Sequence, residues 1–175
     1  MSPQIDAIVL AAGLSTRTGE RNKLLLPLAG KPLIAHAVEA ALGALADTVH
    51  VVTGHQSDRV AAALNDYTIN IVHNPNYAEG MSSSIKSGIR ALPTELDGVV
   101  LCLGDMPLVV SHHLDLLINN FAVNVPCAPY YRERRGHPVL FPRSMFSDLL
   151  QLSGDTGARK PVSYTHLTLP TNREV

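Results

Sequence analysis

Short apolar runs alternate along this chain with segments that favour helices. Four runs are typical of buried parallel strands, at residues 5–12, 48–53, 69–73 and 98–103. Helical periodicity or a helix-starting residue type marks four more segments, at residues 32–46, 58–64, 82–91 and 112–121. Strands and helices that alternate in this way need crossover connections, which favour a mostly parallel sheet covered by helices on both faces. We therefore predict a three-layer, Rossmann-like α/β fold.

Length and charge narrow the class of protein. The chain has 175 residues, of which 46% are hydrophobic, and this size favours one domain. Its 14 Lys and Arg against 15 Asp and Glu give a formal net charge of −1, so no overall field attracts nucleic acid or an anionic membrane. No apolar run approaches the roughly 20 residues of a membrane helix, and the N-terminus has no signal-peptide core. Binding to nucleic acid or membrane is therefore not expected.

The two cysteines, Cys102 and Cys127, have neither the spacing of a disulfide framework nor that of a metal site. Reduced thiols are typical of the cytoplasm, where we expect this protein.

The C-terminal part follows the alternation less closely. A strand is predicted at residues 138–141 and a helix near 143–152. Residues 162–175 are rich in Thr, lack periodicity, and resemble a translated sequencing-adapter read-through more than native protein. We expect a domain over residues 1–160 and a non-native tail over residues 161–175.

The loop after the first strand, L-A-A-G-L-S-T-R-T-G-E-R-N-K, carries glycines and cations. Gly13, Gly19, Arg17 and Lys23 follow the carboxyl end of the strand, where open α/β sheets bind ligands. Glycines let backbone N–H groups approach phosphate oxygens, and cations offset phosphate charge. From its residues alone, this loop is either a phosphate cradle or a turn with a solvated basic face.

Two known phosphate-binding fingerprints do not match this loop. The segment between Gly13 and Gly19 is one residue too long for a Walker loop, and Glu20 stands where that motif requires lysine. A Rossmann fingerprint requires G-x-G-x-x-G and a later acidic residue near the end of the second strand, where this chain has Thr53-Gly54-His55. A nicotinamide-dependent oxidoreductase is therefore disfavoured.

Two later segments combine turn residues with ligand chemistry. Residues 73–89, H-N-P-N-Y-A-E-G-M-S-S-S-I-K-S-G-I, lead into a helix N-terminus that can bind an anion, although Ser82 could equally cap the helix. In G-V-V-L-C-L-G-D-M-P-L, Asp105 ends a strand, where a carboxylate suits Mg²⁺ or simply closes a turn before Pro107.

These segments resemble the MobA-like nucleotidyltransferases. The resemblance rests on L-A-A-G-x-S-x-R-x-G followed by K-L-L-L-P-L-A-G-K-P-L, on N-P-x-Y-x-x-G-M-x-x-S-I, on G-D-M-P, and on the later G-H-P and S-G-D-T-G-A-R. It implies the nucleotide-diphospho-sugar transferase (MobA-like) fold. Ala12, where a second glycine would stand in A-G-G, is more similar to the CTP-using molybdopterin cytidylyltransferases than to the GTP-using enzymes.

The resemblance implies transfer of CMP from CTP to the phosphate of a molybdopterin-type cofactor, with Mg²⁺ as the metal, release of pyrophosphate, and a molybdenum hydroxylase as a partner. Related enzymes leave two alternatives open: another nucleotide such as GTP, or a sugar or polyol phosphate as acceptor. A third alternative is a non-catalytic protein that delivers molybdenum cofactor.

The resemblance also assigns roles to residues. Lys23, Arg17 and Asp105 would be catalytic, with Asp105 as the metal ligand, and Gly136 and His137 would bind the acceptor. The nucleotide would be bound by Leu10, Ala12, Gly13, Ser15, Arg17, Lys23, Asn74, Gly80 and Ser82. The family continues to a strand with a second metal aspartate in a D-x-D-T-P pattern, and no such pattern follows Lys160, which implies that the domain is incomplete at its C-terminus.

Overall fold

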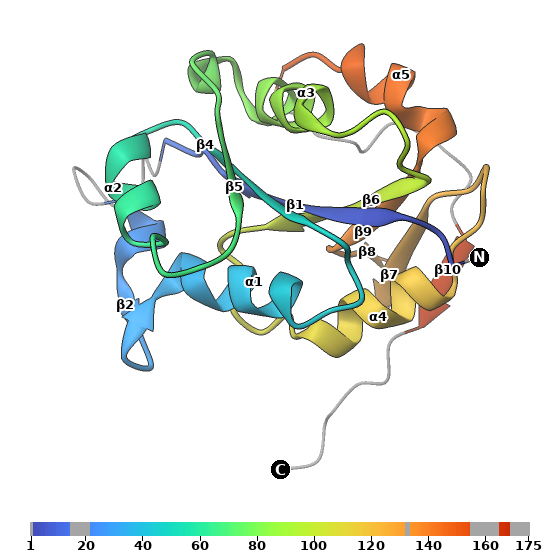
Figure 1. Ribbon diagram of the computed structural model, residues 1–175, viewed down its shortest axis with the longest axis horizontal. Coiled ribbons are helices and arrows are strands. Elements are labelled where there is room, and N and C mark those ends of the chain that lie inside the picture. Colours follow the sequence, from blue (N-terminus) through green and yellow to red (C-terminus); the bar gives the residue numbers. More distant parts are fainter. Residues whose placement is uncertain (1, 15–21, 132–133, 155–164, 169–175) are drawn as a thin grey trace.

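A computed structural model describes residues 2–14, 22–131, 134–154 and 165–168 (Figure 1). Its centre is an eight-stranded sheet with the order β10-β7-β9-β6-β1-β4-β5, and β8 pairs with β7. The strands are β1 (Ile5–Ala11), β4 (Val49–Thr53), β5 (Asn70–His73), β6 (Gly98–Leu103), β7 (Cys127–Tyr131), β8 (Arg134–Arg135), β9 (Val139–Pro142) and β10 (Thr165–Thr168). A separate hairpin is formed by β2 (Pro27–Leu28) and β3 (Lys31–Pro32).

The middle of the sheet is parallel, as predicted. Strand β1 pairs in parallel with both β4 and β6, and β4 pairs in parallel with β5. Strand β9 is antiparallel to β6 and β7, so the sheet is mixed but mostly parallel. Leu10 is opposite Val52 on one side and Leu103 on the other, and the carboxyl ends of β1, β4 and β6 therefore lie at one edge.

Helices cover both faces of the sheet (Figure 1). One hydrophobic core joins it to α1 (Leu33–Leu42), α2 (Ser57–Ala62) and α4 (Ser111–Asn119), and the other joins it to α3 (Met81–Ala91) and α5 (Phe146–Leu150). Along β1, Ala7 and Val9 belong to the first core and Ile8 and Leu10 to the second, as the alternation of a strand requires. The predicted three-layer α/β fold is confirmed.

Some elements differ from the expectation. Helix α1 ends at Leu42 rather than at residue 46, because the following residues turn into β4 and the N–H of Leu45 donates to Asp115 Oδ1 at 2.8 Å. The hairpin β2–β3 and strand β7 were not predicted. Strand β10 lies within residues 161–175, and its pairing with β7 involves backbone groups, which require no particular side chains. The expectation of a non-native tail therefore stays a prediction.

Both cysteines are buried free thiols. Burial raises the pKa of Cys102 to about 12 and that of Cys127 to about 11, so both stay protonated near neutral pH and are poor nucleophiles. Within the described part of the chain, no helix has the length and apolar character needed to span a membrane.

Candidate functional site

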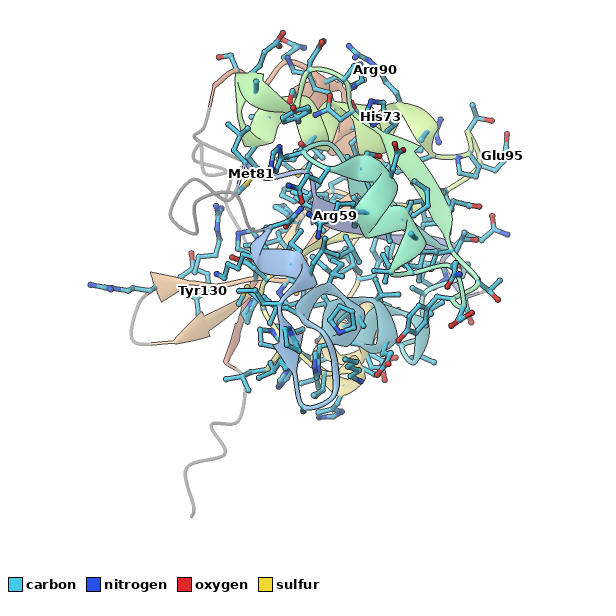
Figure 2. All side chains as sticks on the ribbon, turned by 90° about the vertical axis from the view of Figure 1, so that its left-hand side faces the viewer. Arg59, His73, Met81, Arg90, Glu95 and Tyr130 are labelled. Carbon is cyan, nitrogen blue, oxygen red and sulfur yellow. The ribbon has the colours of Figure 1, made fainter. Side chains whose placement is uncertain are left out.

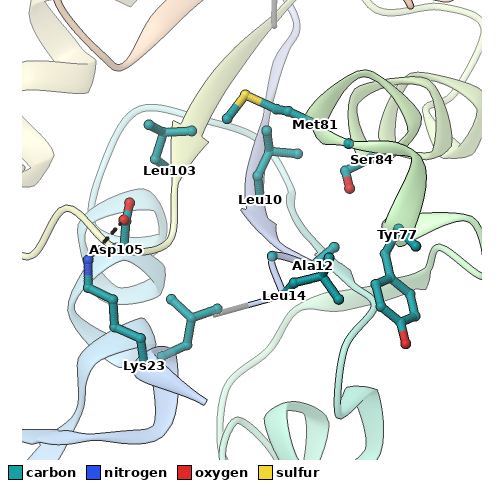
Figure 3. A pocket seen from close by; sticks show the side chains of 13 residues that line it. Leu10, Ala12, Leu14, Lys23, Tyr77, Met81, Ser84, Leu103 and Asp105 are labelled. Atoms are coloured by element: carbon teal, nitrogen blue, oxygen red, sulfur yellow. Dashed lines mark hydrogen bonds and ion pairs between the residues drawn. The ribbon is translucent and has the colours of Figure 1, made fainter. Parts of the chain in front are cut away.

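A pocket of about 450 Å³ opens at the carboxyl ends of β1 and β6, beside the start of α3 (Figure 3). The pocket floor consists of Leu10 near the end of β1, of Ala12 just after that strand, and of Leu103 at the end of β6. The other lining residues come from three neighbouring segments: Gly13, Leu14, Lys23, Leu24, Tyr77, Ala78, Gly80, Met81, Ser84 and Asp105.

Two glycines lie beside the pocket floor, and Gly13 is one of its lining residues. Gly13 is exposed, and a Cβ placed on it would meet no atom of the described residues within 4 Å. At Gly54, a Cβ would lie 2.9 Å from the Cβ of Ala12 and 2.4 Å from that of Tyr77. Tyr77 can therefore pack against the end of β1 only because residue 54 has no side chain.

A third glycine places the carboxylate of the site. The Gly104 N–H donates to the carbonyl oxygen of Leu10 at 2.9 Å, which ties the end of β6 to β1. A Cβ on Gly104 would lie 2.8 Å from that same oxygen and 2.6 Å from Cδ1 of Ile34. This close approach turns the chain so that Asp105, the next residue, stands at the pocket rim.

Lys23 and Asp105, 82 residues apart in sequence, form an ion pair at this rim. Their Nζ and Oδ2 atoms are 3.2 Å apart, and about half of each side chain is exposed, 49% and 46% (Figure 3). Lys23 begins a short 3₁₀ helix, η2 (Lys23–Leu25). Buried Asn22 caps this helix: its Oδ1 accepts from the Leu24 N–H at 3.0 Å, and its Nδ2 donates to the His55 carbonyl oxygen at 3.3 Å.

An exposed ion pair adds only about 0–1 kcal/mol to stability. The Lys23–Asp105 pair therefore contributes little to the fold. At the pocket rim, Lys23 can attract an anion and Asp105 can attract a cation.

The pocket wall consists of Tyr77, Ala78, Gly80, Met81 and Ser84. It is formed by the 3₁₀ helix η3 (Tyr77–Glu79) and the first turn of α3. Gly80 joins the two helices with φ 98° and ψ −178°, a conformation that is essentially restricted to glycine. Of these wall residues, only Gly80 was predicted. Met81 and Ser84 could have been predicted as lining residues from their spacing of three residues, which places both on one face of the helix that begins at the site.

The other predicted nucleotide-binding residues have different environments. Leu10, Ala12, Gly13 and Lys23 line the pocket, whereas Asn74 and Ser82 do not. Asn74 is 1% exposed and Ser82 is 3% exposed, and the Ser82 N–H donates to the Gly154 carbonyl oxygen at 3.3 Å. Ser15 and Arg17 lie outside the described residues. The nucleotide contacts proposed for these residues remain predictions.

Gly136 and His137 lie just before β9 and do not line the pocket. Val139 is opposite Leu101 of β6, so the chain enters β9 near the end of β6 that leads to Asp105. Pro138, which follows His137, shares a small cavity with Met106, which follows Asp105. The predicted acceptor segment thus adjoins the segment of the predicted metal ligand, and its role stays a prediction.

The donor set suits Mg²⁺ only in part. Asp105 offers a hard, accessible carboxylate at the rim, while the residues described here bring no three His, Cys, Asp or Glu side chains together. Mg²⁺ usually takes one or two protein carboxylates together with phosphate oxygens of the substrate. The rim therefore fits a divalent ion that is shared with a phosphorylated ligand.

A pocket at the carboxyl edge of a parallel sheet, with apolar lining residues and a lysine and an aspartate at its rim, is typical of α/β proteins whose ligands carry phosphate groups. The family model of the MobA-like NTP transferase domain matches residues 7–169, and the chain belongs to this family.

Relatives of known name are consistent with this membership. The molybdenum cofactor cytidylyltransferase of Escherichia coli is 30% identical over 160 residues, which cover 89% of this chain and 79% of the relative. The bifunctional protein GlmU of Halorhodospira halophila is 37% identical over 119 residues, which cover 67% of this chain. The match spans only about a quarter of that longer relative, 25% of its length.

Solved structures show the same fold. Rv0371c of Mycobacterium tuberculosis has a TM-score of 0.83 at 28% identity, with 97% of this chain and 91% of that chain covered. A nucleotidyl transferase from Methanothermobacter has a TM-score of 0.77 at 27% identity, with 87% and 78% covered. A further structure of Rv0371c, with a TM-score of 0.79, is a complex with manganese; it is 26% identical and covers 95% of this chain and 90% of that one.

Proposed function

We propose that this protein is a nucleotidyltransferase that moves CMP from CTP to the phosphate of a molybdopterin-type acceptor and releases pyrophosphate. The observation that carries the proposal is the Lys23–Asp105 pair at the rim of the pocket, since it offers one group to a triphosphate and one to its metal ion. Membership of the NTP transferase family and the similarity to the cytidylyltransferase of Escherichia coli support the choice of reaction and of acceptor.

The reaction needs no protein nucleophile. An oxygen of the acceptor phosphate attacks the α-phosphorus of CTP in line, a new P–O bond forms, and the bond between the α-phosphorus and the bridging oxygen breaks as pyrophosphate leaves. Lys23 would offset phosphate charge, and the pocket floor and wall would hold the nucleoside. Asp105 would hold the Mg²⁺ ion, which supplies further neutralisation of charge when bound.

Nucleotide choice tests this proposal. The loop reads A-A-G at residues 11–13, a form more similar to the CTP-using than to the GTP-using enzymes, and Ala12 lines the pocket. A difference of one methyl group in a pocket discriminates between ligands by about 10- to 200-fold, so we expect CTP with Mg²⁺ to bind at least about tenfold more tightly than GTP. Isothermal titration calorimetry with each nucleotide measures the two dissociation constants. A preference for GTP, or for a sugar or polyol phosphate acceptor in a pyrophosphate-release assay, would contradict the proposal.

Replacement of Lys23 by methionine should weaken CTP binding. A charge-assisted contact to phosphate contributes about 1.5–3 kcal/mol, which corresponds to an increase of roughly 10- to 150-fold in the dissociation constant. The difference between Lys23→Met and the parent should shrink as salt is raised, because salt screens exposed charges.

Lys31→Met is the matched control, since Lys31 pairs with Glu39 away from the pocket. Equal affinities of Lys23→Met and the parent at low salt would remove Lys23 from the phosphate site.

A further inference from the structure

A buried polar network lies behind the pocket wall and is centred on Asn74. Its Nδ2 donates to Oγ of Ser83 at 2.9 Å and to Oγ of Ser84 at 3.0 Å, and its Oδ1 accepts from the Asn76 N–H at 3.0 Å. Both amide hydrogens and the carbonyl oxygen therefore have protein partners. With 1% of its surface exposed, the Asn74 side chain is enclosed by the protein.

Ser83 extends this network to both ends of η3. Its hydroxyl oxygen lies 2.8 Å from the carbonyl oxygen of Asn76, which precedes η3, and 2.8 Å from that of Gly80, which follows it. One hydroxyl proton is shared between the two carbonyls while the oxygen accepts from Asn74. The two ends of the short helix that carries Tyr77 are thus joined by one buried side chain.

The network and the pocket wall lie in the same segment, residues 74–84. Ser84 belongs to both, since its hydroxyl accepts from Asn74 and the residue lines the pocket. Tyr77 also packs directly over Gly54. A fully satisfied buried network specifies one conformation of the backbone around it. The shape of the wall therefore depends on bonds made behind it.

We propose that Asn74 and Ser83 are positioning residues of the nucleotide pocket, which hold the wall of residues 77–84 in its binding conformation without contacting the nucleotide. This inference rests on the proposed function for the identity of the ligand. It assigns Asn74 a different role from the direct contact that the family resemblance implies. Loss of the network should weaken nucleotide binding in the ground state and the transition state alike, so KM should rise while kcat changes little.

The test compares Ser83→Val with Ser83→Thr, two side chains of nearly equal shape of which only threonine keeps the hydroxyl. With CTP and Mg²⁺ as the probe, Ser83→Val should raise both Kd and KM about tenfold or more and leave kcat within about threefold. Ser83→Thr should bind CTP within about threefold of the parent. The control, Ser87→Val, places the same β-branched residue in α3 outside the network and the pocket lining, and it should bind CTP like the parent.

Hydrogen exchange of the backbone amides of residues 74–84 provides the second readout. In Ser83→Val this segment should exchange faster than in the parent and in Ser87→Val, while the strands of the sheet stay protected. Parental CTP affinity and exchange in Ser83→Val would overturn the proposal, as would a fall of kcat equal to that of kcat/KM. If the parent bound GTP rather than CTP, the proposed function would fail, and the exchange rates would still decide whether the network holds the wall.

Discussion

Asp105→Asn is expected to lower kcat at least about 100-fold, because catalysis by charge neutralisation loses a large part of its effect when one such group is removed. Asparagine keeps the volume of the side chain and one acceptor oxygen, and it loses the negative charge that a hard cation requires. The melting temperature should stay within about 2 °C of the parent, since the ion pair with Lys23 is half exposed and asparagine also suits a turn.

Steady-state release of pyrophosphate and calorimetry of Mg²⁺ in the presence of CTP measure the two effects of this substitution. Asp148→Asn is the matched control, since it removes an exposed carboxylate from α5, away from the pocket. Parental turnover in Asp105→Asn would leave Asp105 as a residue that closes a turn, and the proposed mechanism would lose its metal ligand.

The buried elements of the fold were accessible from the sequence. Strand β6 has the predicted limits, because a continuous apolar run is flanked by glycines at residues 98 and 104 and is buried on both faces. Strand β7 was missed because it contains Pro129, which lacks an N–H and weighs against a strand in any local pattern. Its place in the sheet depends on pairing with distant strands, β8 and β9, which a local pattern does not contain.

The location of the site could be predicted, and its internal geometry could not. Loops after parallel strands meet at one edge, which made Lys23 and Asp105 candidates for a common site. Their 3.2 Å contact depends on the adjacency of β1 and β6, which the order of elements along the chain does not determine.

Burial separates the two kinds of residue in the second motif, residues 73–89. Tyr77 lines the pocket, whereas Asn74 is buried. The sequence motif alone does not show whether an asparagine lines a pocket or is buried beside it. The direction in which each side chain of a short turn points is set by the hydrogen bonds of that turn, here those of Asn74 and Ser83. These bonds emerge only with the three-dimensional structure.

His50→Ala is expected to destabilise the fold by about 3–5 kcal/mol, the cost of removing one partner of a buried pair. His50 Nε2 donates to Asp6 Oδ2 at 2.9 Å, between the neighbouring strands β4 and β1, and the two side chains are only 5% and 2% exposed. Without His50, the Asp6 carboxyl group stays buried without its partner. Urea denaturation of the parent and the variant measures the loss in free energy of unfolding.

The double variant Asp6→Leu/His50→Leu separates the cost of a stranded carboxyl group from the net contribution of the pair. Apolar residues of similar volume often replace a buried pair at little or no cost, so the double variant should be clearly more stable than His50→Ala. Asp6 lies near the start of β1 and the pocket at its end, so the folded fraction of every variant should bind CTP like the parent. A loss of affinity in folded His50→Ala as large as that in Lys23→Met would show that the two ends of β1 are coupled, contrary to this expectation.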